Sequence, residues 1–159
     1  MGGLVSSNCN IQICELGILG EYIVTACNEV VNFLNINTNE IRYKIYDKEA
    51  EHGFVTHLKA SGNLLAIGYS SGTILVYDLE IGEESEFTEL HRFQFHRTGV
   101  SVIYFDEDNT QMYSGGQDTY IVVYDLVSDQ AQYKLMGHKE SVTQLSLFVL
   151  KNPYLKGRT

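Results

Sequence analysis

Two aspartates stand in the stretch "MYSGGQDTYIVVYDL", Met112–Leu126, and their chemistry can take three forms. Asp118 lies in the turn between two short apolar runs, and Asp125 closes the second run. A turn carboxylate can act as a general acid or base, bind a metal ion, or accept hydrogen bonds that hold a fold together. The elements that position the two residues decide between these roles.

A serine nucleophile is suggested by "GYSSG", residues 68–72, which matches the G-x-S-x-G elbow of hydrolases with Ser70 at its centre. That elbow needs a strand, a sharp turn and then a helix. The residues that follow, "TILVYDL", are typical of a strand. A β-turn in which Gly72 supplies unusual backbone angles explains the same letters. We therefore expect a turn here, no catalytic residue in the chain, and no enzyme.

Metal and cofactor chemistry is not supported by the spacing of the candidate ligands. His52 and His57 are five apart, as are His91 and His96, which fits neither a helical zinc pair nor one face of a strand. The acidic run "DLEIGEESEFTEL" lacks the spaced ligands and central glycine of a calcium loop. No phosphate-binding glycine pattern is present. We expect no metal and no cofactor.

The composition describes a chain of 159 residues, 44% hydrophobic, which is enough for one packed domain. The net charge of −9 disfavours direct, sequence-independent binding of nucleic acid. Three cysteines without Cys-x-x-Cys spacing are typical of a reducing, intracellular compartment. No apolar run is long enough to span a membrane, so no membrane partner is expected, although Gly2 and Ser6 fit the myristoylation pattern.

The pattern of the opening stretch occurs elsewhere in the chain. "LLAIGYSSGTILVYDL", 64–79, has the same order of strand, small-residue turn, strand and Tyr-Asp, 47 positions earlier. A weaker copy, "YIVTACNEVVNFLNI", 22–36, precedes it by a further 43 positions. A period of 40–50 residues in β-rich sequence predicts propeller blades of four strands each. The expected fold is all-β.

The third repeat shows all four strands of one blade. Equivalent histidines, His96 and His138, each precede an apolar run by four positions, at Val100 and Val142. We therefore expect a single partial propeller with blades at about 10–47, 54–95 and 96–137, and the start of a fourth at 138–159. The predicted strands of the third blade are Val100–Phe105, Gln111–Gly115, Tyr120–Asp125 and Tyr133–Met136.

At these residues the chain resembles the WD-repeat (WD40) β-propeller family. The resemblance implies that His96, Ser114, Asp118 and Tyr124 form one buried hydrogen-bonded network. Asp118 follows Ser114 by four positions and precedes Tyr124 by six, which is the family's spacing. A buried carboxylate needs donors, and an imidazole held between it and a hydroxyl supplies them. We therefore interpret Asp118 as a structural residue.

The chain departs from the family pattern because it contains no tryptophan. Only the third repeat carries a nearly complete network, so the first two must depend more on apolar packing. The tryptophan place is taken by Tyr124, Tyr77 and Leu34; the turn aspartate place by Ser71 and Asn28 in the second and first repeats; and the strand serine place by Ile67 and Val24.

A closer resemblance is to the N-terminal propeller of the Dip2/Utp12 family, nucleolar WD proteins of the small-subunit processome. Three runs carry it: "EYIVTACNEVVNFLNINTNEI", "LLAIGYSSGTILVYDL" and "GGQDTYIVVYDLVSDQAQYKLMGHKESVT". The resemblance implies a non-catalytic scaffold in small-subunit ribosomal RNA processing and ribosome biogenesis. It also implies a nuclear, nucleolar location, processome proteins as partners, and RNA contact only within the U3 small nucleolar ribonucleoprotein. The alternative is a WD adaptor of another complex, such as a ubiquitin-ligase substrate receptor.

Ring closure leads to a further expectation. Propellers close ~4–8 blades into a ring, which protects the strand edges. Three repeats and a fourth that stops after one strand do not complete the usual seven-blade ring, so we interpret the chain as part of a longer protein. Because exposed apolar faces drive association, we expect the isolated chain to self-associate or to be marginally soluble.

Overall fold

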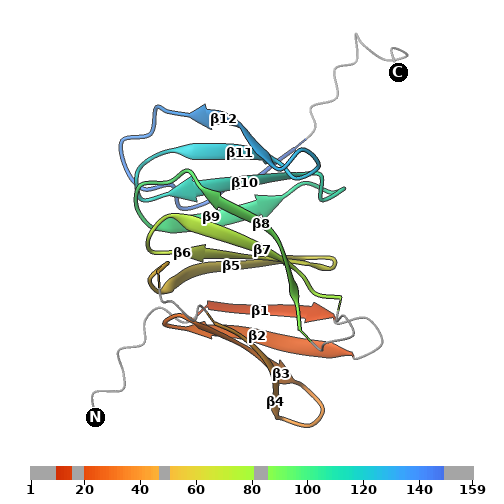
Figure 1. The fold of residues 1–159 in the computed structure, drawn as a ribbon. Helices are drawn as coiled ribbons and strands as arrows, with labels where there is room; N and C mark the ends of the chain where they lie inside the picture. The colour runs from red at the N-terminus through yellow and green to blue at the C-terminus, as the bar shows by residue number, and fades with distance from the viewer. Residues whose placement is uncertain (1–9, 16–19, 47–50, 81–85, 149–159) are drawn as a thin grey trace, which may run out of the picture.

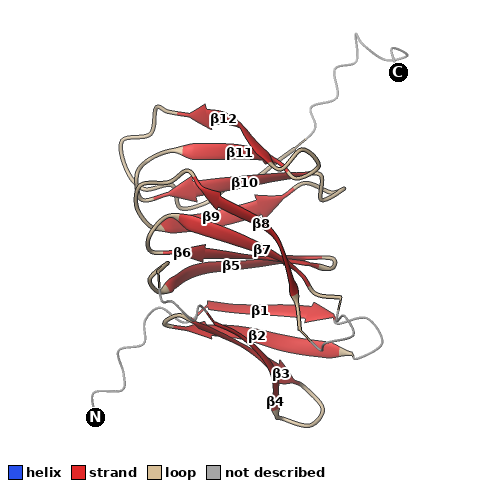
Figure 2. Ribbon diagram, viewed as in Figure 1, coloured by secondary structure: helices blue, strands red, loops and turns tan. Residues whose placement is uncertain are grey.

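The structure is a computed structural model that describes residues 10–15, 20–46, 51–80 and 86–148. These residues form twelve strands and contain no helix, which confirms the all-β prediction (Figures 1 and 2). The strands are β1 Asn10–Glu15, β2 Glu21–Cys27, β3 Val30–Asn35, β4 Ile41–Tyr46, β5 Val55–Ser61, β6 Leu64–Tyr69, β7 Thr73–Asp78, β8 Thr88–Gln94, β9 Val100–Phe105, β10 Gln111–Gly116, β11 Ile121–Asp125 and β12 Gln130–Leu135.

The strands pair in chain order into three antiparallel four-stranded sheets, which we call the first (β1 to β4), second (β5 to β8) and third (β9 to β12) sheets. Each sheet is a meander of hairpins, and the three are stacked face to face (Figure 1). The predicted first strand of the third repeat is correct at both ends, and the other three differ by one to three residues at their ends.

Two apolar layers hold the sheets together. The layer between the first and second sheets includes Phe33 and Leu65, and the layer between the second and third includes Met112 and Tyr124. In β2 of the first sheet, which lies at one end of the stack, side chains alternate between buried and more exposed positions. In β6 of the middle sheet, five consecutive residues are buried because neighbours cover both faces.

The hairpin between β6 and β7 needs a glycine. Gly72 has φ +92°, and a Cβ at this position would collide with the backbone carbonyl of His96 in the loop between β8 and β9. Only glycine adopts this conformation without strain and also allows so close an approach. The predicted role of Gly72 is therefore confirmed, and the turn packs directly against the residue that begins the third repeat's network.

A valine at the start of one unit packs into a glycine position of the sheet before it. A Cβ on Gly68 of β6 would lie 2.8 Å from the Cβ of Val100, and one on Gly115 of β10 would lie 2.7 Å from the Cβ of Val142. Both valines are at most 5% exposed. The missing side chain at each glycine makes room for the next unit.

A side-chain hydroxyl hydrogen bond also connects each of these pairs of units. Thr56 Oγ1 donates a 2.5 Å hydrogen bond to the carbonyl of Val100, and Ser101 Oγ donates to the carbonyl of Val142. Each hydroxyl follows the first valine of its own unit in the chain. Val142 therefore meets the third sheet as Val100 meets the second.

The strand expected in "SVTQLSLF", 141–148, does not form. Val142 alone makes sheet-like contacts: its N–H donates to Gly116 O at 3.2 Å, and its carbonyl accepts from Ser101. A strand needs a neighbour along its length, and among the described residues no second strand of a fourth sheet is present to supply one. Residues 149–159 lie outside the described part.

Candidate functional site

The four residues of the predicted network lie together between the second and third sheets. His96 follows β8, Ser114 is on β10, Asp118 is in the β10–β11 turn, and Tyr124 is on β11. His96 Nδ1 lies 3.0 Å from Asp118 Oδ1, and His96 Nε2 lies 2.6 Å from Ser114 Oγ. The Ser114 hydroxyl is also 2.9 Å from the Tyr124 oxygen. The structure thus brings all four together in one chain of hydrogen bonds.

One assignment of protons satisfies every member of this chain. Tyr124 O–H donates to Ser114 Oγ, the Ser114 O–H donates to His96 Nε2, and His96 Nδ1–H donates to the Asp118 carboxylate. Each donor then has an acceptor, and the imidazole needs no extra proton. A fully satisfied buried network fixes one arrangement of the residues that form it.

Asp118 anchors the network because it accepts several bonds at once. Its carboxylate accepts from the backbone N–H groups of Arg97 at 2.8 Å and Tyr120 at 3.2 Å, as well as from His96. Burial acts to raise the pKa of Asp118, but these hydrogen bonds outweigh it and hold the pKa below its ordinary value. The folded state therefore favours the ionised form of the Asp118 carboxylate.

Tyr124 does the packing that the family assigns to tryptophan. It is fully buried, and its ring centroid lies 4.5 Å from that of Phe93 and 6.0 Å from that of Phe95. Burial raises the pKa of Tyr124 well above its ordinary value, so the phenol stays a neutral donor. The ring thus joins the outer strand of the second sheet to the third sheet.

Ser114, His96 and Asp118 have the hydrogen-bond order of a hydrolase triad, but not its setting. A catalytic serine must present its Oγ to a substrate carbonyl beside an oxyanion hole. Here Ser114 is 0% exposed and its oxygen is already hydrogen-bonded to the Tyr124 oxygen. Gly116 packs so closely that a Cβ would lie 2.5 Å from both Asp118 Oδ1 and His96 Nδ1. This packing indicates a structural clamp between the two sheets.

The other predicted chemistry resolves into ordinary contacts. Ser70 Oγ accepts from the Phe54 N–H at 3.1 Å, and the strand β7 follows where a nucleophile elbow needs a helix. His52 packs against the ring of Tyr69 at 5.3 Å. Among the described residues, no three His, Cys, Asp or Glu side chains gather as metal ligands. Over the same residues, no helix has the length and hydrophobicity to cross a membrane.

The first repeat differs from its prediction at one place. Thr25, not Val24, holds the ladder position of Ser114, because Thr25 pairs with Asn32 two residues before Leu34. The β2–β3 hairpin is one residue shorter than the other two, which shifts the alignment. Val24 instead faces the second sheet and is fully buried.

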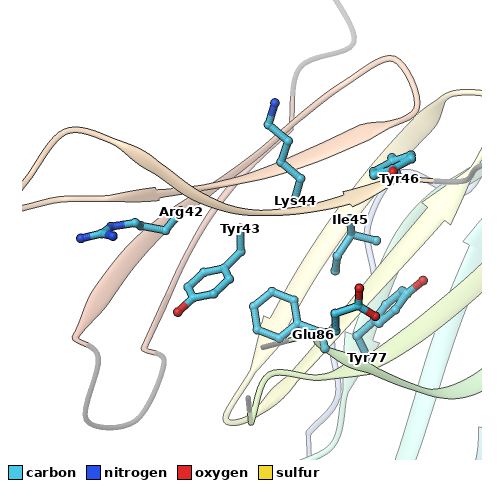
Figure 3. Close-up of a pocket in the computed structure, with 8 residues that line it drawn as sticks. Arg42, Tyr43, Lys44, Ile45, Tyr46, Tyr77 and Glu86 are labelled. Carbon is cyan, nitrogen blue, oxygen red and sulfur yellow. The ribbon is translucent and has the colours of Figure 1, made fainter. Parts of the chain in front are cut away.

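A groove at the perimeter of the first two sheets was not predicted from the sequence. It has a volume of about 360 Å³ and lies between β4 and the segment that leads into β8 (Figure 3). The sequence signal for the groove is a difference between two equivalent positions. The outer strand β8 has the aromatic residue Phe93 where the outer strand β4 has Ile45. Its lining residues are Arg42, Tyr43, Lys44, Ile45, Tyr46, Tyr77, Glu86 and Phe87.

Comparison with protein families and solved structures agrees with this architecture. Residues 87–125 match the family described as WD domain, G-beta repeat, and span β8 to β11. The crystal structure of RRP9 WD40 repeats superimposes with a TM-score of 0.70 at 20% identity, covering 89% of this chain and 42% of that one. The three sheets are therefore blades of a β-propeller. Residues 87–125 carry a WD40 repeat, and the chain has the fold of a partial WD40 propeller.

Curated relatives match over just under three-fifths of the chain. The U3 small nucleolar RNA-associated proteins 12 of Saccharomyces cerevisiae and 15 of Schizosaccharomyces pombe are 33% and 29% identical over 104 and 90 residues, 58% and 57% of this chain. The sterol regulatory element-binding protein cleavage-activating protein of Xenopus laevis is 33% identical over 91 residues, 57% of the chain. The match to protein 12 confirms the resemblance to the Dip2/Utp12 family. These matches span only 10%, 17% and 6% of the relatives, in the order given.

Proposed function

We propose that this chain is a non-catalytic WD-repeat scaffold that mediates protein–protein interactions in small-subunit ribosomal RNA processing and ribosome biogenesis. The observation that carries the proposal is the similarity to two relatives named for association with U3 small nucleolar RNA. The WD40 repeats themselves indicate the broader class, a protein-interaction scaffold. The narrower role comes from the relatives.

The structure supports a scaffold role, because the polar side chains that resemble a catalytic site are buried while other side chains are exposed at the surface. The set that most resembles a catalytic site, Ser114 with His96 and Asp118, is buried between two blades. The outermost strands instead present strand edges and exposed side chains such as Tyr46 and Leu90, 54% and 42% exposed. Surfaces of this kind recognise other proteins by adding strands or by covering apolar side chains.

We further propose that residues 1–159 form a single partial propeller in which residues 138–159 begin a fourth blade. The place of Val142 over Gly115, which repeats that of Val100 over Gly68, supports this division. Processome subunits are the proposed partners, and the nucleolus is the proposed location. Because the net charge is −9, contact with RNA is indirect and passes through the partner proteins.

Affinity purification tests the proposal. The tagged chain, expressed in its native cells, is expected to enrich U3 small nucleolar RNA and processome proteins over a tag-only control. Nuclease treatment before elution should remove the RNA and leave the protein partners bound, because the RNA contact is indirect. Recovery of a cullin complex instead, with no enrichment of U3 RNA, would assign the chain to a ubiquitin-ligase receptor and contradict the proposed role.

A further inference from the structure

The groove at the rim of the first two blades has aromatic walls. It is lined by Tyr43 and Ile45 from β4, by Tyr77 from β7, and by Glu86 and Phe87, which directly precede β8. Tyr43 and Ile45 point from β4 toward the second blade, whereas Lys44 lies on the opposite side of the strand (Figure 3). A pocket of about 360 Å³ is large enough for a side chain of a partner protein.

The pocket exists because a side chain is shorter here than at the next blade boundary. Ile45 of β4 pairs with Val31 of β3, and Phe93 of β8 pairs with Ile74 of β7. Ile45 and Phe93 therefore hold equivalent positions in the first and second sheets. Tyr77 likewise holds the place of Tyr124.

At the second boundary the ring of Phe93 packs 4.5 Å from that of Tyr124, which is fully buried. At the first boundary Ile45 supplies no ring, and Tyr77 stays partly exposed. The groove therefore lies at the place that the Phe93 ring occupies at the second boundary.

The neighbouring edge of β4 is suited to an added strand. β4 ends the strand order of its sheet, and among the described residues no strand pairs with its outer edge. An extended peptide can add to such an edge through main-chain hydrogen bonds while a pocket selects one of its side chains.

The positive charge of β4 favours particular residues on either side of an aromatic side chain that a bound peptide inserts into the groove. Arg42 and Lys44 also line the groove, alternate with Tyr43 and Ile45, and are exposed. Ile41–Tyr46 contains no acid, although the chain as a whole has a net charge of −9. Cross-strand neighbours of opposite charge stabilise a sheet. A strand that inserts an aromatic side chain into the groove therefore places its flanking residues opposite Arg42 and Lys44, where acids are favoured.

One wall of the groove already carries an aromatic ring next to an acid. Phe87 follows Glu86 and packs with its ring centroid 4.6 Å from that of Phe33 and 5.4 Å from that of Tyr43. A second ring beside Tyr77 would extend this cluster, since offset aromatic pairs are favourable beyond the apolar area that they bury.

We propose that the groove between β4 and the segment that leads into β8 binds an extended segment of a partner protein with the pattern acidic–aromatic–acidic, which adds to the edge of β4 and inserts its aromatic side chain between Ile45 and Tyr77. The proposal rests on the scaffold class and not on the role in ribosome biogenesis. If the peptide does not bind but processome proteins still co-purify, only the peptide proposal fails. If the peptide binds but processome proteins do not co-purify, only the proposed role in ribosome biogenesis fails.

The blocked peptide Val-Glu-Phe-Glu-Val tests the proposal by nuclear magnetic resonance titration of the ¹⁵N-labelled chain. We expect shifts that saturate at millimolar peptide and centre on Tyr43, Ile45 and Tyr77, with about tenfold weaker binding when alanine replaces the phenylalanine. Ile45→Phe fills the pocket from within and should weaken binding by about the same factor. Lys44→Glu should weaken it severalfold, whereas Lys139→Glu, the same charge change on an exposed residue outside the groove, should have no effect.

The proposal is overturned if the phenylalanine peptide does not bind, or if the alanine peptide binds equally well. It is also overturned if the folded Ile45→Phe chain keeps the full affinity, or if Lys44→Glu and Lys139→Glu behave alike. Circular dichroism of each variant establishes that it is folded. Because Lys44 is exposed, its substitution keeps the test decisive even if Ile45→Phe perturbs the apolar layer.

Discussion

Asp118→Ala is expected to lower the free energy of unfolding by ~1–3 kcal/mol. The substitution removes the acceptor of three donors: the backbone N–H groups of Arg97 and Tyr120, and His96 Nδ1–H. Arg97 is exposed, so water can replace the carboxylate at its N–H. The His96 side chain is 0% exposed, so its Nδ1–H stays buried without an acceptor, and that penalty sets the magnitude.

Urea unfolding followed by far-ultraviolet circular dichroism and tyrosine fluorescence measures this loss, since the chain has eleven tyrosines and no tryptophan. Asp108→Ala is the matched control, because Asp108 is exposed in the turn before β10, and it should cost less than ~0.5 kcal/mol. Equal losses for the two variants would refute the network as a source of stability. Since the folded pKa of Asp118 is depressed, its contribution is present above about pH 4 and should disappear as the pH falls through that lower pKa.

Four further outcomes are expected. Burial and the charge of Lys59 lower the pKa of His57 to about 4, so the chain should lose on the order of 3 kcal/mol as the pH falls from about 6.5 to 4, and His57→Gln should flatten this part of the pH profile; parallel profiles would contradict it. Gly72→Ala should cost more than ~1 kcal/mol and more than Gly20→Ala in urea unfolding, because the two glycines share a positive φ but only Gly72 faces a carbonyl; equal costs would remove the collision argument. A fluorophosphonate probe should leave Ser70 unlabelled in mass spectrometry, and labelling would show a nucleophile. The isolated chain should elute as an oligomer in size-exclusion chromatography with light scattering, because apolar side chains such as Val127 and Leu135 are exposed; a stable 18.0 kDa monomer would contradict this.

The third blade could be predicted closely because its sequence signals agree with one another. The strand Val100–Phe105 is bounded by glycine before it and by acidic turn residues after it, and both of its ends were predicted correctly. The spacing of Ser114, Asp118 and Tyr124 places the hydroxyl, the carboxylate and the phenol on two paired strands and the turn that joins them. His96 could be added only through the family pattern, since it comes from the loop before the blade.

The misplaced features depend on pairing partners that one segment of sequence does not reveal. Thr25 takes the ladder place of Ser114 because the β2–β3 hairpin is one residue shorter, and only the observed register shows this. The segment after Val142 has the composition of a strand but lacks a neighbour to pair with among the described residues. The rim groove depends on the contrast between Ile45 and Phe93, which carries meaning only once both are known to occupy the same position in adjacent blades.

The ratio of U3 small nucleolar RNA recovered with the tagged chain to that recovered with the tag alone tests the central claim most directly. A scaffold of small-subunit ribosomal RNA processing predicts strong enrichment, together with processome proteins that stay bound after nuclease treatment. Recovery of U3 RNA at the level of the tag alone, from a chain that is folded and present in the nucleus, would contradict the account.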